Sequence, residues 1–389
     1  MSRLSRSFVR APLALALLGL PALSACGDGG GGGEPDARVA PPIDAYFPPG
    51  TDAYVAPGTD AYVTPGTDAY VPPGTDAGPI EMPDAFTAGV DAAMTSSGTE
   101  PTGMGPYAVT DSTATVMESG RRTPVTAYVP SLPAGTTAPL VLFLPGFQLN
   151  TDQYAGTLER LASHGFVVVG ANPAGSLLSV NHVNMAADGR AVITWATSEA
   201  PFAASVDATR IGVAGHSLGG KLSTLITMDD DRIDALYAID PVDGDPSPLG
   251  GGGSRDRPDL VPSRGAEITV PAGFAGETTN GMSGGGFGSM ACAPSEQNFQ
   301  QFYSAATAAP WAAQWDITGA DHMDFLDNPD CGFTCSVCPD GPADDGTVLA
   351  TNRTLLTAFF RRHLASDAAM DAYLTGASVP AGVSAMHRP

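Results

Sequence analysis

The chain has 389 residues, of which 43% are hydrophobic, so it can bury one large core or two of medium size. It carries 41 acidic and 18 basic residues, which give a formal net charge of −23. Because proteins bind phosphate backbones through basic patches, this balance argues against a nucleic-acid partner.

Residues 1–25 are predicted to be a lipoprotein signal peptide. Arginines precede an apolar run over residues 11–23, and this run is shorter than the ~20 apolar residues of a membrane-spanning helix. It ends in Leu-Ser-Ala before Cys26, which resembles the bacterial lipobox, whose cysteine is lipidated. We expect an extracytoplasmic protein, anchored through Cys26 to a bacterial membrane, in the periplasm or on the cell surface. The alternative is an ordinary signal peptide followed by an unrelated cysteine.

Residues 26–105 are predicted to be a low-complexity tether. A glycine-rich run is followed by the phrase Pro-Gly-Thr-Asp-Ala-Tyr-Val, which begins at Pro49, Pro57 and Pro65, with a shortened copy from Pro73. Repeats that stack into a solenoid are ~20–45 residues long, so units this short and rich in Pro-Gly predict an extended spacer. The alternative is an adhesive or carbohydrate-binding segment that uses the tyrosines.

Residues 106–374 are predicted to be a folded α/β domain, with 375–389 as a C-terminal tail. Continuous apolar runs are typical of strands that are buried on both faces, and they alternate with segments of helical spacing. This alternation predicts a mostly parallel sheet with helices on both faces. The expected strands are residues 123–129, 139–145, 166–169, 210–214, 235–239, 268–274 and 314–317, and the expected helices are 152–164, 184–198, 219–228 and 351–364.

The strongest chemical signal is the run Gly215-His216-Ser217-Leu218-Gly219, which lies between an expected strand and an expected helix. This is the context of a nucleophile elbow, in which glycines two residues before and after the serine leave room for neighbouring backbone. The amino terminus of the following helix favours developing negative charge. Ser217 is therefore predicted to be a nucleophile.

A serine nucleophile needs a base, and after such an elbow the acid and then the histidine follow in chain order. The histidines beyond the serine are His322, His363 and His387. His363 lies on the last expected helix among arginines, and His387 lies in the expected tail. His322 follows an expected strand, where a loop can bring it to the serine, so we predict that it is the base. The alternative is an exposed loop histidine beside two carboxylates.

Three carboxylates are candidates for the acid. Asp240 follows the expected strand 235–239, at the end of a parallel strand where open sheets place their sites. Glu277 follows the next expected strand, and Asp245 lies shortly after Asp240. Asp240 is the first choice, and each of the three could instead be a solvated loop residue.

An oxyanion hole also needs two backbone donors. The N–H of Leu218, directly after the nucleophile, is predicted to be one of them. The other is expected in the loop Pro145-Gly146-Phe147. Proline has no N–H and glycine lets the backbone turn closely, so Phe147 is the predicted donor. The alternative is a plain turn.

Several of these segments together resemble chlorophyllase and its bacterial α/β-hydrolase relatives. The resemblance extends over residues 123–364, and it is carried by residues 142–147, 161–168, 215–221, 235–244, 292–294 and 319–327. It implies the α/β-hydrolase fold, hydrolysis of esters by a Ser-His-Asp triad without metal or cofactor, and Asp240 as the acid. Plant chlorophyllases have an arginine where this chain has Leu218, and they lack the glycine-rich stretch 250–253 and the tether.

Four further cysteines fit an exported protein: Cys292, Cys331, Cys335 and Cys338. An even number in an oxidising compartment predicts two disulfides, and all three connectivities remain open. A pairing of Cys292 with the later cluster would restrain the loop of His322. The alternative is a four-cysteine zinc site that includes Cys335 and Cys338.

The predicted function is that of a monomeric serine hydrolase acting on a small-molecule or lipid-like carboxylic ester through an acyl-enzyme. Two other classes remain open. One is a non-catalytic surface-binding lipoprotein that has the same fold. The other is an acyltransferase or amidase, because an acyl-enzyme can pass its acyl group to other acceptors.

Overall fold

A computed structural model describes residues 100–389, apart from 176–179, 245–252, 283–290, 330–331, 333–334 and 337. All of these residues belong to the unit Ala85–Pro389. The expected signal peptide with Cys26, the tether up to residue 99, and two candidate residues, Asp245 and Cys331, lie outside the described part.

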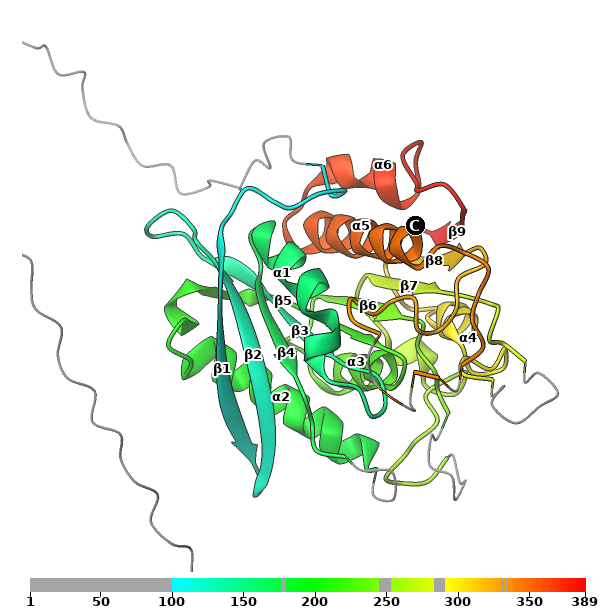
Figure 1. Ribbon diagram of the computed structural model, residues 1–389. Coiled ribbons are helices and arrows are strands. Elements are labelled where there is room, and N and C mark those ends of the chain that lie inside the picture. Colours follow the sequence, from blue (N-terminus) through cyan, green and yellow to red (C-terminus); the bar gives the residue numbers. More distant parts are fainter. Residues whose placement is uncertain are drawn as a thin grey trace, which may run out of the picture. The chain divides into compact units, whose positions relative to one another are not determined.

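A nine-stranded sheet runs through the described residues in the order β1-β2-β4-β3-β5-β6-β7-β8-β9 (Figure 1). The strands from β4 to β8 are parallel, while β1, β2 and β9 are antiparallel to their neighbours. The prediction of a mostly parallel α/β-hydrolase sheet is confirmed. The strands are β1 (Val109–Glu118), β2 (Arg121–Pro130), β3 (Ala138–Leu144), β4 (Val167–Ala171), β5 (Val206–His216), β6 (Ala235–Ile239), β7 (Ala272–Gly276), β8 (Ala312–Ile317) and β9 (Val383–Arg388), and the helices are α1 (Ala155–Ser163), α2 (His182–Ser198), α3 (Leu218–Asp229), α4 (Phe299–Ala305), α5 (Asp345–Leu364) and α6 (Asp371–Leu374).

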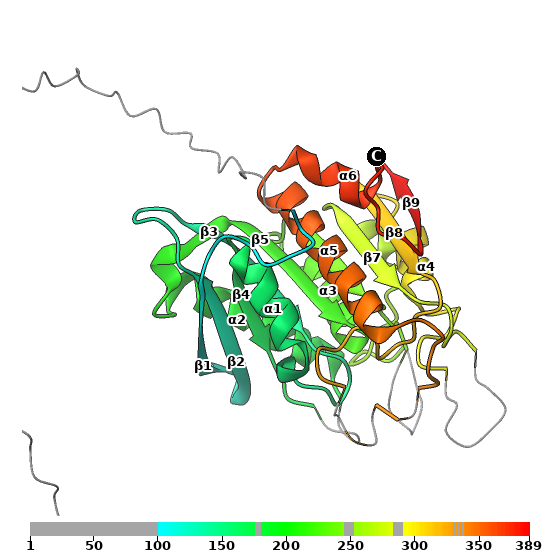
Figure 2. The same ribbon diagram turned by 45° about the horizontal axis from the view of Figure 1, so that its top comes forward.

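Helices cover both faces of the sheet (Figures 1 and 2). Successive side chains of a strand point to opposite faces, so the fully buried β3 serves two cores. Leu142 packs into the core shared with α2, α3 and α4, whereas Val141 and Phe143 pack into the core shared with α1 and α5. This two-sided burial explains the continuous apolar run of β3. Among the described residues, no helix is both long and apolar enough to cross a bilayer.

The connections of the sheet create a crevice between β3 and β5. The chain leaves β3 for β4 on one side, then crosses to β5 on the other side of β3 and continues to β6. Parallel sheets bind ligands at such a point, outside the carboxyl ends of the strands, because the two loops part there. Phe147 follows β3 and Ser217 follows β5, so both lie at this crevice.

The folded domain extends beyond both predicted boundaries. Residues 375–389, expected to be a tail, contain β9, which pairs along the whole of β8. At the other end, the N–H of Gly105, expected in the tether, donates to Ser163 Oγ of α1 at 2.7 Å. Both segments are mostly exposed, so they lack the apolar periodicity that marks a core element.

Other elements were shifted or missed. The expected strand 268–274 is β7, which begins only at Ala272, because Pro271 precedes it and a 3-10 turn lies at Gly265–Glu267. The expected strand 210–214 is the end of β5, which begins at Val206. The edge strand β1 was not predicted because it is rich in exposed polar residues, and α4 is only two turns long.

We predict that truncation after Gly382 lowers the melting temperature, because it removes β9 and exposes the edge of the buried strand β8. It also removes Arg388, which stacks on the Tyr303 ring at 4.2 Å and donates to the carbonyl of Ala306. A loss of ~2 kcal/mol lowers the melting temperature of a domain of this size by about 4–8 °C. Thermal unfolding monitored by circular dichroism gives the result. Removal of Pro389 alone is the control, and equal melting of both truncated chains would contradict a structural role for β9.

Candidate active site

Ser217 occupies a sharp turn between β5 and α3. Its backbone has φ 55° and ψ −120°, a strained conformation for a residue with a side chain. A Cβ at Gly215 would overlap the carbonyl of Gly219, and a Cβ at Gly219 would overlap the carbonyl of Leu144. The two glycines are therefore needed because the backbone crosses itself closely here. The turn leaves the Ser217 side chain only half-buried, so a ligand can reach it.

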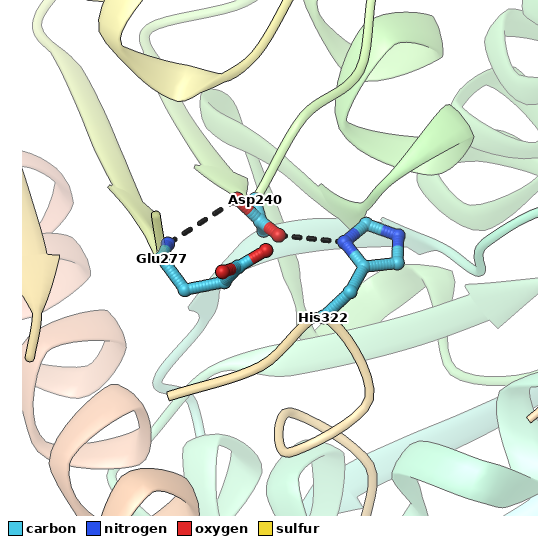
Figure 3. A group of neighbouring side chains, drawn as sticks. All are labelled: Asp240, Glu277 and His322. Atoms are coloured by element: carbon cyan, nitrogen blue, oxygen red, sulfur yellow. Dashed lines mark hydrogen bonds and ion pairs between the residues drawn. The ribbon is translucent and has the colours of Figure 1, made fainter. Parts of the chain in front are cut away.

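The structure brings Ser217, His322 and Asp240 together from three segments of the chain. Ser217 Oγ lies 2.9 Å from His322 Nε2, and His322 Nδ1 lies 2.6 Å from Asp240 Oδ2 (Figure 3). Asp240 directly follows β6 and is fully buried, and His322 is in the loop after β8. The N–H of His322 donates to Asn280 Oδ1 at 3.0 Å, which fixes the loop.

These contacts define how protons can be arranged in the site. A carboxylate only accepts hydrogen bonds, so His322 donates its Nδ1 proton to Asp240. Its Nε2 lone pair is then directed to the Ser217 hydroxyl, which can donate to it. The arrangement can take a proton from the serine and stabilise the imidazolium that results.

Glu277, the second candidate acid, lies beside this group but does not bind His322 (Figure 3). Its Oε2 accepts from the N–H of Asn280 at 2.8 Å, and its own N–H donates to Asp240 Oδ1 at 3.4 Å. Burial, together with the nearby Asp240 charge, raises the pKa of Glu277 to about 9. A carboxyl that is neutral at neutral pH does not stabilise an imidazolium, so Asp240 fits the role of histidine partner better.

Asp240, Glu277 and His322 also have the spacing of a possible metal site. Each offers a ligand atom, and these atoms all lie within 4.8 Å of one another. However, the 2.6 Å contact between His322 Nδ1 and Asp240 is a hydrogen bond, and His322 Nε2 faces Ser217. A metal ligand must offer a lone pair, so an ion would have to break one of these contacts. The donor set fits a hydrogen-bonded triad better than an ion.

Phe147 and Leu218, the two predicted oxyanion donors, line one cavity of about 430 Å³ next to Ser217. Neither backbone N–H has a hydrogen-bond acceptor among the described residues. The N–H of Gly146, by contrast, donates to Tyr154 Oη at 3.3 Å. Phe147 is thus the first residue after β3 whose N–H is available to a ligand.

Tyr154 is a part of the site that sequence reasoning missed. It lies in the 3-10 turn Thr151–Tyr154 and is fully buried, and its hydroxyl contacts His216 Nδ1 at 2.7 Å. The ring of His216 in turn packs against the ring of His322 at 4.7 Å. Burial, with a smaller contribution from His322, holds the pKa of His216 well below its usual range, so His216 is neutral. Tyr154 therefore connects the loop after β3 to the turn that contains Ser217.

A buried ion pair joins the helix after Ser217 to the loop after Asp240. Lys221 Nζ lies 3.1 Å from Asp243 Oδ1 and donates to the Asp243 carbonyl at 2.7 Å. Asp243 also accepts from the N–H groups of Leu260 and Val261, each at 2.8 Å. The pair holds three backbone segments together behind the site.

Disulfides form near the histidine loop. Cys292 is bonded to Cys338, so one of the open pairings is now fixed. Cys335 is disulfide-bonded as well. A cysteine in a disulfide offers no thiolate to zinc, so these bonds argue against the zinc site. Close to Cys338, the Pro339 carbonyl accepts from Asn280 Nδ2 at 2.9 Å, so the disulfide braces the residue that holds His322.

The sequence is similar to proteins of one known family. The family model described as Chlorophyllase matches residues 102–380. Chlorophyllase-1 of Arabidopsis thaliana is 28% identical over 219 residues, which cover 51% of this chain and 62% of the relative. Chlorophyllase-1, chloroplastic, of Citrus sinensis is 27% identical, covering 50% and 58%. Chlorophyllase type 0 of Chenopodium album is 24% identical, covering 59% and 68%. The chain thus spans about three fifths of the first two relatives.

We predict that Tyr154→Phe lowers the free energy of unfolding by about 1–3 kcal/mol, because it leaves buried polar groups at Gly146 and His216 without a partner. Urea denaturation measures the change. Tyr128→Phe is the matched control, since Tyr128 is also buried but its hydroxyl makes no hydrogen bond to a described residue. Equal losses in the two variants would mean that the Tyr154 hydroxyl bonds contribute nothing.

Glu277 should make the protein less stable as the pH rises. Its folded pKa of about 9 lies above the ordinary value of 4.5, so between these values the unfolded chain is ionised here while the folded chain keeps the proton. Stability then falls with rising pH, by up to ~1.4 kcal/mol per unit. We predict that Glu277→Gln flattens this slope in denaturation series from pH 5 to 9. Glu267→Gln is the control, because the Arg264 side chain lowers the pKa of Glu267, so it titrates below this window. An unchanged slope in Glu277→Gln would show that Glu277 is ionised in the folded protein.

Proposed function

Because this chain belongs to the chlorophyllase family, we propose that it is a serine hydrolase that cleaves carboxylic esters, with Ser217 as its nucleophile. The observation that carries the proposal is the continuous chain of hydrogen bonds from Ser217 Oγ through His322 to Asp240, at 2.9 Å and 2.6 Å. It lies at the carboxyl edge of the sheet, beside a cavity that a substrate can enter.

In the proposed reaction, Ser217 Oγ attacks the ester carbonyl carbon while His322 Nε2 takes its proton. Asp240 stabilises the imidazolium through its bond to Nδ1. The tetrahedral intermediate collapses when the carbon–oxygen bond to the alcohol breaks and His322 gives its proton to the leaving oxygen. A water molecule, deprotonated by the same nitrogen, then attacks the acyl carbon. The bond from this carbon to Ser217 Oγ breaks, His322 returns the proton to Oγ, and the acid is released.

The negative charge of the tetrahedral intermediate needs preorganised donors. The N–H groups of Phe147 and Leu218 are proposed for this role, because both lack an acceptor among the described residues and both residues line the cavity. Removing one such donor typically lowers kcat by about 10²–10³-fold. The contact of Tyr154 with Gly146 supports this role, since it holds the backbone directly before Phe147.

The proposed setting of the reaction is outside the cytoplasm. Three features support it: the signal-like segment 1–25, the lipobox-like Cys26 and the disulfide between Cys292 and Cys338. We propose a monomer held at a bacterial membrane by a lipid on Cys26, with the segment from there to residue 99 as spacer.

We predict that Ser217→Ala abolishes hydrolysis of 4-nitrophenyl acetate and butyrate by the chain without residues 1–26, with kcat falling by about 10⁴–10⁶-fold. Ser263→Ala, at an exposed serine, is the control and should keep the wild-type rate. Asp240→Asn should lose about 10⁴-fold, as expected for loss of the histidine partner. A fluorophosphonate probe should label the wild type at Ser217.

Other results would redirect the assignment. Full hydrolysis by a folded Ser217→Ala variant would refute the proposed nucleophile. A folded wild type that neither labels nor hydrolyses would point instead to a binding protein. Labelling without ester hydrolysis, but with acyl transfer to an added amine or alcohol, would identify an acyltransferase.

A further inference from the structure

The cavity beside Ser217 has an apolar floor and begins at the proposed oxyanion donors. Its volume of about 430 Å³ lies in the usual range of small-ligand sites, about 300–1,000 Å³. The floor is formed by buried hydrophobic side chains of Leu149, Val180, Met185, Leu218 and Leu222. Because Phe147 and Leu218 both line this cavity, one part of a bound ester would extend from the carbonyl into it.

Arg122 lies at the mouth of the cavity because of the direction of β2. This strand runs antiparallel to β4, and the pairing ends with Val125 opposite Ala171, the last residue of β4. The residues of β2 that precede Val125 therefore extend past the carboxyl end of β4. Arg122 is thus brought to the edge of the sheet that carries Ser217.

The charge of Arg122 is not neutralised by any residue that the structure describes. Its neighbour Arg121 forms an ion pair with the buried Asp188 at 2.7 Å. Arg122, which is exposed, forms no ion pair or hydrogen bond with any described residue. Among the described residues that line the cavity, Arg122 is the one charged side chain and none is a carboxylate. In a chain with 41 acidic and 18 basic residues, a cavity whose described lining carries one positive charge favours an anionic ligand.

We propose that Arg122 selects esters that carry a carboxylate on the part of the molecule that enters this cavity. A guanidinium group pairs with a carboxylate through two parallel hydrogen bonds, while the carbon chain between carboxylate and ester packs on the apolar floor. The inference rests on the proposed function, because it assigns a substrate class to the same site. Arg122 acts on binding, so its effect is expected in KM more than in kcat.

The test compares matched pairs of esters with and without a carboxylate. Mono-4-nitrophenyl adipate against 4-nitrophenyl hexanoate places the carboxylate on the acyl side, and 4-carboxyphenyl acetate against phenyl acetate places it on the alcohol side. In at least one pair, Arg122→Gln should lower kcat/KM for the anionic ester by about tenfold relative to the neutral ester, mainly through KM. Arg122→Glu should lower it further, and added salt should weaken the wild-type preference.

Arg362→Gln is the control, because it makes the same charge change on α5, where Arg362 binds Asp371 at 2.7 Å. It should leave unchanged the ratio of kcat/KM for the anionic ester to kcat/KM for the neutral ester. The proposal is overturned if Arg122→Gln leaves this ratio unchanged in both pairs, or if Arg362→Gln lowers it equally. Either result is compatible with rapid hydrolysis of the neutral esters, which would leave the serine-hydrolase assignment intact. If the wild type cleaves none of the esters, the proposed function fails and the inference fails with it.

Discussion

Lys221 and Asp243 form a buried ion pair that joins the helix after Ser217 to the loop after Asp240. The lysine begins the second turn of α3, whose first residue follows Ser217, and the aspartate lies three residues after Asp240. Burial raises the pKa of Asp243, while Lys221 and two backbone N–H groups oppose that rise. Removing one partner of a buried pair leaves an uncompensated charge and costs about 3–5 kcal/mol. The pair thus adds to the backbone hydrogen bond from the Ser217 N–H to the Ile239 carbonyl, at 2.9 Å, in holding Ser217 and Asp240 in place.

Around this pair, the site is built from the ends of parallel strands and from short loops with little freedom. Ser217 keeps a strained backbone because β5 and α3 pack closely on both sides of it, with glycines where any Cβ would collide. Asp240 also has a positive φ, of 40°, at the end of β6. His322 is on the long connection between β8 and α5, and it is braced by Asn280 and the nearby disulfide. The ends of the strands therefore position Ser217 and Asp240, and the Asn280 contact and the nearby disulfide position His322.

The sequence was informative where chemistry and local pattern coincide. Strand and helix periodicity located most of the parallel sheet, and the elbow, the chain order and the strand ends indicated Ser217, Asp240 and His322, which the structure finds in hydrogen-bonding contact. Local patterns in the sequence do not indicate contacts between segments that lie far apart in the chain. The Tyr154 hydroxyl contacts His216 across 62 positions of the chain. Arg122 reaches the cavity because of the direction of β2, and β9 joins the sheet by pairing with β8 at its edge. Neither position follows from the local spacing of residues.

The burial of Lys221 also determines how the folded domain responds to a protease that cleaves at lysine. The chain contains no other lysine, so a lysine-specific protease has one peptide bond to cleave, inside α3. That bond becomes accessible only in molecules whose α3 has left the sheet. When opening and closing are fast relative to cleavage, the rate at which the two fragments appear reports the population of opened molecules. Cleavage at Lys221 thus measures local opening of the folded domain without any engineered label.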